Sequence, residues 1–528
     1  MEYIQGTNKY QIELSPISLD DYIGEGSIVR LIEAFVNTLD MSQLGFLKSK
    51  LNKTGRPPFD PRMLLKLYIY GYLNRVRSSR RLHAETERNI EVMWLMDRLS
   101  PDARTICYFR KDNAKAIKKV YREFSKLCCK LELYGKELIA IDGTKVRANS
   151  SRHNIYTEEK VKKALIGLDE KIEKYMNKLN ENDTEDSLDP RYTAKDITEI
   201  IESLSKKKRK LEDTLNHINE NDGKAVSSVD TDARIMKQSG EGRSHDACYN
   251  VQTAVDSKHK LIPDFKISTC SNDVGELSEL TENVKEIMET NEIDVTADKG
   301  YYSADDIAQC EKNGTSCYLP KVGDNNHAPD RNYDKKHFKY DKESDCYICP
   351  EGKILSTKQA IHEQAGVVCG YAYGNKKACK TCAKRDLCTK NKRGNRTVRR
   401  SLNQDALDIV DERMRTRYGR LKLNQRREMV EHPFGTVKKI WGYNQYLCRG
   451  VEMVEAEQSL AFLAYNFRRV INIYKQKGED LLAVLATCAL FFIFGKQKSR
   501  PVWTRFRYFP GGSLVGVFSQ SEGVTVAI

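Results

Sequence analysis

The run ELIAIDGTKVRA at residues 137–148 is apolar and rich in β-branched side chains, and it is broken at Asp142-Gly143. Such a run predicts a buried strand, with Asp142 at its end. Three similar runs follow further along the chain, at Tyr249–Asp256, 260–268 and Glu292–Asp298. This part of the chain is therefore constrained to fold around a sheet.

The segment from Asp273 to Thr290 has a helical pattern instead. Its apolar side chains recur at spacings of three and four residues, at Leu277, Leu280, Val284 and Ile287. An apolar stripe of this kind packs one face of a helix against a core. Strands interrupted by such a helix predict an α/β fold.

Two of the predicted strands end in an aspartate, Asp142 in IDGTKVRA and Asp298 in TADKGYYS. Strand ends are where α/β proteins display functional groups, but most such aspartates only cap turns, so both interpretations stay open. A third carboxylate, Glu431, lies in RREMVEHPFGTVKK. Two Mg²⁺ ions that drive phosphodiester chemistry need anionic oxygen ligands from separate elements, which this set could supply.

The third segment has an informative spacing. Arg427, Glu431 and Lys438 share one face of a continuous helix, where a metal-binding carboxylate would lie between two cations able to hold phosphates. An exposed helix with ordinary ion pairs has the same pattern. Pro433 predicts a kink or an end of the helix near Glu431, and a fresh start there would redirect Lys438.

Residues 1–130 are predicted to be helical. Asp60 can cap a helix that begins at Pro61, and the apolar stretch MLLKLYIYGYLNRV predicts that this helix is buried. The segment RVRSSRRLHAETERN is basic at its start, which makes Arg80 and Arg81 candidate DNA contacts. A helical domain with a solvated basic face explains these residues equally well.

Charge and hydropathy narrow the class of protein. The 528 residues include 88 Lys and Arg against 74 Asp and Glu, a net charge of +14. This balance favours a polyanionic partner, although ribosome-associated and membrane-surface proteins share it.

The sequence shows no pattern of membrane targeting. The start MEYIQGTNKY lacks the pattern of a signal peptide. The apolar run Leu481–Phe494 is too short to span a bilayer, so we expect a core or interface helix there. The expectation is a cytoplasmic protein with no membrane partner.

Two long segments separate the predicted strands and are interpreted as insertions. Residues 156–222 carry apolar side chains at helical spacing on both sides of the polar turn ENDTEDSLDP. That pattern predicts an antiparallel helical hairpin, a structural or dimerising arm. The second insertion, residues 326–400, is rich in Cys, Lys and Tyr.

The cysteines of the second insertion are spaced as metal ligands. Without a secretory signal, the 15 cysteines of the chain are better interpreted as thiols or ligands than as disulfides. Two Cys-x-x-Cys pairs predict a structural Zn²⁺ site, with the ligands Cys346, Cys349, Cys379 and Cys382. Reduced surface thiols are the alternative, and Cys369 or Cys388 could replace a ligand.

Taken together, these segments resemble the bacterial insertion-sequence DDE transposases, whose catalytic domain is RNase H-like. The similar segments are IDGTKVRANSSR, YNVQTAVD, ADKGYYS, VEHPFGTVKKIWGY, the R-x3-E-x6-K array at Arg427, and the helical stretch TGRPPFDPRMLLKLYIYGYLNRVRSSRRLHAETERN. They are most similar to the insertion-sequence group numbered eleven-eighty-two, allied to groups four and five. The resemblance covers about residues 10–475.

The resemblance implies a domain organisation. A helical DNA-binding domain would occupy residues 1–130, and an RNase H-like DDE catalytic domain residues 131–475. The helical hairpin (156–222) and the cysteine-rich module (326–400) would be insertions in that α/β core, and residues 476–528 form a C-terminal tail without an assigned role.

The resemblance also implies an activity. Asp142, Asp298 and Glu431 would be the catalytic triad, holding two Mg²⁺ ions, or Mn²⁺ in their place, that activate water and then a DNA 3′-OH for attack on phosphorus. Arg427 and Lys438 would contact DNA. The implied partners are the terminal inverted repeats of the element and target DNA, bound by a homodimer. Asn424 stands where the family usually has Tyr. This departure supports one alternative, a catalytically decayed DNA-binding protein of the same fold; another RNase H-like nuclease is a second alternative.

Overall fold

The computed structural model describes most of the chain. The described residues are 18–50, 57–184, 194–221, 223–237, 245–323, 328–362, 366–391, 395–485, 506–508 and 514–516. Most of the predicted hairpin turn, and the apolar run beyond residue 485, lie outside them.

The part of the chain before the first strand is helical among the described residues. Its helices are α1 (Ile28–Asn37), α2 (Met41–Leu44), α3 (Pro61–Leu73), α4 (Ser79–Arg88), α5 (Ile90–Leu95), α6 (Ala103–Asp112) and α7 (Ala114–Lys130), preceded by the 3₁₀ turn η1 (Asp20–Tyr22). Asp60 caps α3 by accepting a hydrogen bond from the Arg62 amide at 2.8 Å, and Pro61 is the first helical residue. The described side chains of α3 are almost all buried, as its uniformly apolar sequence predicts.

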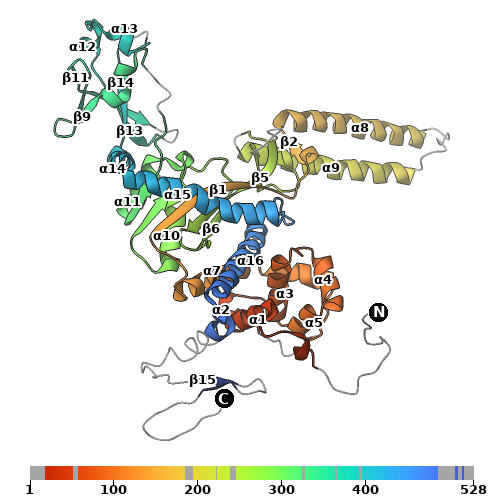
Figure 1. Ribbon diagram of the computed structural model, residues 1–528. Coiled ribbons are helices and arrows are strands. Elements are labelled where there is room, and N and C mark those ends of the chain that lie inside the picture. The colour runs from red at the N-terminus through yellow and green to blue at the C-terminus, as the bar shows by residue number, and fades with distance from the viewer. Residues whose placement is uncertain are drawn as a thin grey trace, which may run out of the picture.

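A mixed sheet forms the centre of the molecule (Figure 1). Its main strands are β1 (Leu138–Arg147), β5 (His245–Asp256), β6 (Phe265–Ser268), β7 (Ile293–Thr296) and β8 (Thr315–Tyr318). The order is β2-β3-β4-β5-β1-β7-β8, with β6 also paired to β5. Strand β1 is antiparallel to β5 and parallel to β7. The predicted strands and the mixed α/β class are confirmed, although pairing of the 260–268 run begins only after Pro263, which has no N–H for a ladder. The expected strand end at Asp142 is wrong, because β1 continues through Asp142 and Gly143 to Arg147 while it is paired with β5.

The two faces of β1 bury different neighbours. Leu138 and Ala140 pack against Met429 and Val430 of α15 (Arg417–Phe434). The alternate residue Ile139 joins the main core, to which α10 (Leu277–Met288) contributes its predicted apolar stripe. Because side chains alternate along a strand, Asp142 continues the row that faces α15.

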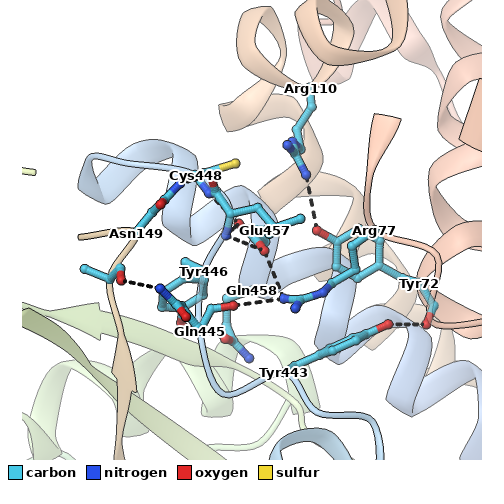
Figure 2. A network of polar contacts seen from close by, with 12 residues as sticks. Tyr72, Arg77, Arg110, Asn149, Tyr443, Gln445, Tyr446, Cys448, Glu457 and Gln458 are labelled. Atoms are coloured by element: carbon cyan, nitrogen blue, oxygen red, sulfur yellow. Dashed lines mark hydrogen bonds and ion pairs between the residues drawn. The ribbon is translucent and has the colours of Figure 1, made fainter. Parts of the chain in front are cut away.

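A buried polar network joins the N-terminal helices to α16 (Val451–Lys477) and the loop before it (Figure 2). Glu457 is 1% exposed, and its carboxylate accepts hydrogen bonds from the Leu447 and Cys448 amides. Arg77 pairs with Glu457 at 3.2 Å and lies over the Tyr443 ring, 4.4 Å from its centroid. The N-terminal helices are thus fastened to α16 and the loop before it through a compensated buried charge.

Two further units project from the sheet (Figure 1). Helices α8 (Glu158–Thr184) and α9 (Ala194–Glu220) lie side by side as the predicted hairpin. Its base is closed by the small strands β2 (Ile155–Tyr156), β3 (Val226–Ser227) and β4 (Arg234–Lys237). The cysteine-rich unit contains the short strands and helices β9 (Lys339–Asp341), β10 (Cys346–Ile348), β11 (Ile354–Leu355), β12 (Thr357–His362), β13 (Val368–Gly374), α12 (Lys376–Lys380), α13 (Arg385–Cys388) and β14 (Thr397–Ser401).

Helices α11 (Ala304–Lys312) and α14 (Gln404–Arg415) pack together beside β8. Across the described part of the chain, no helix combines the length and the apolar character needed to cross a bilayer.

Candidate active site

Asp142 and Asp298 lie in the same region of the sheet, on the neighbouring strands β1 and β7 or just after them. Asp142 is within β1, and Asp298 follows β7, the parallel neighbour in which Thr296 is paired with Ala140. Each aspartate accepts a hydrogen bond from a nearby glycine amide, Asp142 Oδ1 from Gly143 at 3.0 Å and Asp298 Oδ1 from Gly300 at 2.7 Å. The fold therefore brings together two carboxylates that are 156 residues apart.

The electrostatic setting of Asp142 supports this proximity. Burial raises the pKa of Asp142 to about 6, and the negative charge of Asp298 adds to the rise. The guanidinium of Arg426 acts against it, with Nη1 3.2 Å from Asp142 Oδ2. A half-buried carboxylate beside another carboxylate favours a neighbouring cation. In this structure Arg426 takes that place.

Helix α15 lies along β1 on the face that carries Asp142. Beyond Arg426, Lys438 donates hydrogen bonds to Thr144 Oγ1 at 2.9 Å and to the Lys145 carbonyl at 2.8 Å. Lys438 belongs to the π-helical segment η6 (Gly435–Ile440), which continues α15. Burial lowers the pKa of Lys438.

Glu431 and Arg427 lie between these two contacts in the chain, and both side chains are exposed. The expected common face of Arg427, Glu431 and Lys438 is therefore divided, because Lys438 is turned toward β1. Helix α15 includes Pro433 and ends at Phe434, where the π-helical segment η6 continues it directly, so the alternative of a fresh helix start at Pro433 is wrong. Proline removes one helical N–H, and the wider π-helical turn that follows changes the direction of Lys438.

A ready-made cage for a metal ion is not present in the described ranges: no group of three or more His, Cys, Asp or Glu side chains there is arranged to hold one. Asp142, Asp298 and Glu431 consequently do not form a closed group in this structure. The donor chemistry of the two aspartates still suits a hard cation, because Mg²⁺ takes one or two carboxylates and completes its shell with water and substrate phosphates.

The predicted zinc ligands are divided between two environments. Cys346 is buried in β10. Cys349, Cys379 and Cys382 line a small cavity of about 30 Å³ together with Cys388, which was considered only as a replacement. Burial raises the pKa of Cys388 to about 11, and the other three thiols of the cavity add to the rise while Arg396 opposes it.

The two candidate DNA contacts of the N-terminal region, Arg80 and Arg81, are both exposed on α4. Arg77, three residues earlier in the same basic segment, points inward to Glu457 instead. Within one run of arginines, the structure thus separates a half-buried structural cation from two exposed ones that can meet a partner in solution.

Sequence reasoning missed two residues of the site. Arg426, rather than the adjacent Arg427, contacts Asp142. The sequence signal is the apolar pair Met429 and Val430, three and four residues after Arg426, which is buried and marks the inward face of α15. Asp273 was treated only as the start of a helical segment. Its carboxylate accepts hydrogen bonds from Asn250 at 2.8 Å and Gln252 at 2.7 Å, beside Gly143 and Gly300.

Comparisons with known proteins identify two segments of the chain. Residues 17–112 match a family model described as a transposase domain, DUF772, and residues 348–471 match one described as a transposase DDE domain. The second match includes Glu431, while Asp142 and Asp298 lie outside both. No curated protein matches the chain.

One solved structure is similar, the piggyBac transposase synaptic complex with hairpin DNA. It is 10% identical in sequence, with 88% of this chain and 80% of that chain covered, at a TM-score of 0.31.

Proposed function

Because the chain is a DDE transposase of the insertion-sequence type, we propose that it binds the ends of its element and catalyses divalent-metal-dependent cleavage and transfer of DNA strands. The observation that carries this proposal is the meeting of Asp142 and Asp298 beside Arg426. Two acidic side chains from neighbouring parallel strands are a suitable platform for a cation that acts on phosphodiesters.

The sheet supports an RNase H-like interpretation of the core. Strands β6, β5 and β1 are antiparallel in turn, and β7 and β8 continue the sheet in parallel to β1. We take residues 131–475 as the catalytic domain, with 156–222 and 326–400 as insertions and 1–130 as the DNA-binding domain. The insertion-sequence group numbered eleven-eighty-two remains the proposed subgroup.

DDE transposases use divalent metal ions, and here Asp142 and Asp298 would hold them, with Glu431 as the proposed third carboxylate. The chemistry that a bound Mg²⁺ or Mn²⁺ supplies is activation of a water or a 3′-OH and neutralisation of charge at phosphorus. Arg426 keeps Asp142 ionised and compensated before DNA arrives, since a neighbouring cation favours the charged form of a carboxyl group.

The proposed DNA contacts are Arg80 and Arg81 on α4 and Arg427 and Lys438 on α15 and η6. Exposed arginines can pair with phosphates through both guanidinium edges, which suits Arg80, Arg81 and Arg427. To contact a phosphate, the Lys438 ammonium group would have to give up its hydrogen bond to Thr144 Oγ1. The proposed substrate is double-stranded DNA, the element ends and a target, held by a homodimer in the bacterial cytoplasm.

Structural zinc is a separate proposal. The cavity that Cys349, Cys379, Cys382 and Cys388 share supports a tetrahedral thiolate site, with Cys388 in place of Cys346. Zinc would draw the four sulfurs together and offset the mutual repulsion of their ionised forms. It would stabilise the cysteine-rich unit and take no part in DNA chemistry.

The test of the proposed function uses a supercoiled plasmid that carries the gene with its flanking DNA. The variants Asp142→Asn, Asp298→Asn and Glu431→Gln should each lower Mg²⁺-dependent cleavage by more than about 100-fold, because each removes a carboxylate from the metal site. DNA binding, measured by gel shift, should remain. The matched control is Glu428→Gln, which removes an exposed carboxylate of the same helix.

Each outcome of this experiment has a defined meaning. Wild-type cleavage by one variant would remove that residue from the site. Gel shifts without cleavage by the wild-type protein would identify a decayed DNA-binding protein. Breaks without joined products, detected by sequencing, would identify a plain nuclease.

A further inference from the structure

A third acidic side chain lies beside Asp142 and Asp298. Asp273 is in the loop between β6 and α10, and both of its recorded hydrogen bonds, from Asn250 and Gln252, are made to Oδ1. The donors are neutral amides on β5, and Gln252 is fully buried. They orient the carboxylate and do not cancel its charge.

Two glycines make room for this carboxylate. A Cβ at Gly143 would come within 2.7 Å of Asp273 Oδ1, and a Cβ at Gly300 within 3.2 Å of Asp273 Oδ2. The same position at Gly300 is 2.9 Å from Asp298 Oδ1. Asp273 is therefore packed against the residue that follows Asp142 and against the turn that holds Asp298, where any larger residue than glycine would displace it.

A buried hydrogen bond connects Asp273 to the Asp298 turn by a second route. The Tyr301 hydroxyl donates to Gln252 Oε1, and the amide of the same Gln252 donates to Asp273. Burial, followed by the charges of Asp273, Asp142 and Asp298, raises the pKa of Tyr301 well above its usual value. Tyr301 thus stays protonated and keeps Gln252 in the orientation that presents its amide to Asp273.

The charges around these carboxylates are unbalanced. Arg426 pairs with Asp142, but within the described ranges neither Asp273 nor Asp298 forms an ion pair. Three carboxylates held by one guanidinium and neutral amides leave excess negative charge in a partly buried place. Such charge is costly unless a cation compensates it.

We propose that Asp273 is a positioning residue of the metal site. Held by Asn250 and Gln252, its negative charge stabilises a divalent cation at Asp142 and Asp298 without having to coordinate it. This inference rests on the proposed function, and it adds an acidic residue that the Asp142, Asp298 and Glu431 set does not include.

The test is a titration with Mn²⁺ alone, followed by electron paramagnetic resonance, on the full-length protein without DNA. Asp273→Asn keeps an oxygen that can accept from the two amides and removes only the charge. It should bind Mn²⁺ about 10- to 100-fold more weakly than the wild type, the usual cost of losing an outer partner of a metal site. Its melting temperature should not fall, and raising Mn²⁺ should restore part of its DNA cleavage.

The controls separate this inference from the proposed function. Glu286→Gln removes an exposed charge from α10 and should bind Mn²⁺ like the wild type. Wild-type Mn²⁺ affinity in Asp273→Asn, together with lost binding in Asp142→Asn, would overturn the role of Asp273 alone. Wild-type binding and cleavage in Asp142→Asn would overturn the proposed active site itself.

Discussion

Two clusters of buried charge in this protein are built in opposite ways. In the network around Glu457, an arginine and two backbone amides satisfy a carboxylate that is 1% exposed (Figure 2). Around Asp142, Asp273 and Asp298, one guanidinium pairs with Asp142 alone, and within the described residues the other two carboxylates have no ion pair. The first cluster is complete within the chain, and for the second we propose that a divalent cation completes the balance of charge.

The difference separates structural charge from functional charge. A satisfied buried ion pair fixes the arrangement of the elements that supply it, here the N-terminal helices and α16. A cluster of carboxylates with too few cations slightly destabilises the folded protein without a metal ion, and its negative charge favours binding of a cation. A carboxyl group with a raised pKa, as at Asp142, among other carboxylates is typical of active sites.

The largest effect on stability is expected at the compensated cluster. Glu457→Ala leaves Arg77 and two amides without their partner, and should lower the free energy of unfolding by about 3–5 kcal/mol. Urea denaturation measures this. Glu455→Ala, two residues away, breaks only a partly exposed pair with Lys118 and should cost less than about 1 kcal/mol. Equal costs for the two variants would show that the network does not fasten the N-terminal helices.

A smaller effect, on metal affinity, is expected at the cluster of Asp142, Asp273 and Asp298. Arg426→Gln removes a positive charge 3.2 Å from Asp142, so Mn²⁺ alone should bind several-fold more tightly at pH 8, where Asp142 is ionised. Arg427→Gln, next to it but exposed, should leave Mn²⁺ binding unchanged and weaken DNA binding. Weaker Mn²⁺ binding in Arg426→Gln would contradict the view that a metal ion replaces this guanidinium.

The sequence was sufficient for the elements whose patterns are local. The β-branched run before Asp142, the stripe of α10 and the Asp60-Pro61 start of α3 all lie where their residues predict. Strand β8 was missed because TSCY carries little β-branched or alternating signal. Burial of Asp142 and Asp298 at one place follows from β1 and β7 being parallel neighbours, which local patterns do not reveal.

The parts of the site that could not be predicted depend on which residues of α15 face the sheet and on contacts between segments that are distant in the sequence. Placing Arg427 and Lys438 on a common face assumed a regular helix, and the π-helical segment after Pro433 breaks that regularity. Asp273 is recognisable only once Gly143 and Gly300 are seen to make room for it. A loop aspartate before a helix has no distinguishing pattern in one sequence.

The most direct test of the central claim is a metal-switch experiment at Asp142. The claim is that Asp142 binds the divalent ion used for DNA cleavage, and a thiolate in its place disfavours hard Mg²⁺ but tolerates softer Mn²⁺. Asp142→Cys should be inactive on a supercoiled plasmid in Mg²⁺ and should regain cleavage in Mn²⁺. Cleavage by Asp142→Cys in Mg²⁺ at the wild-type rate would contradict the account.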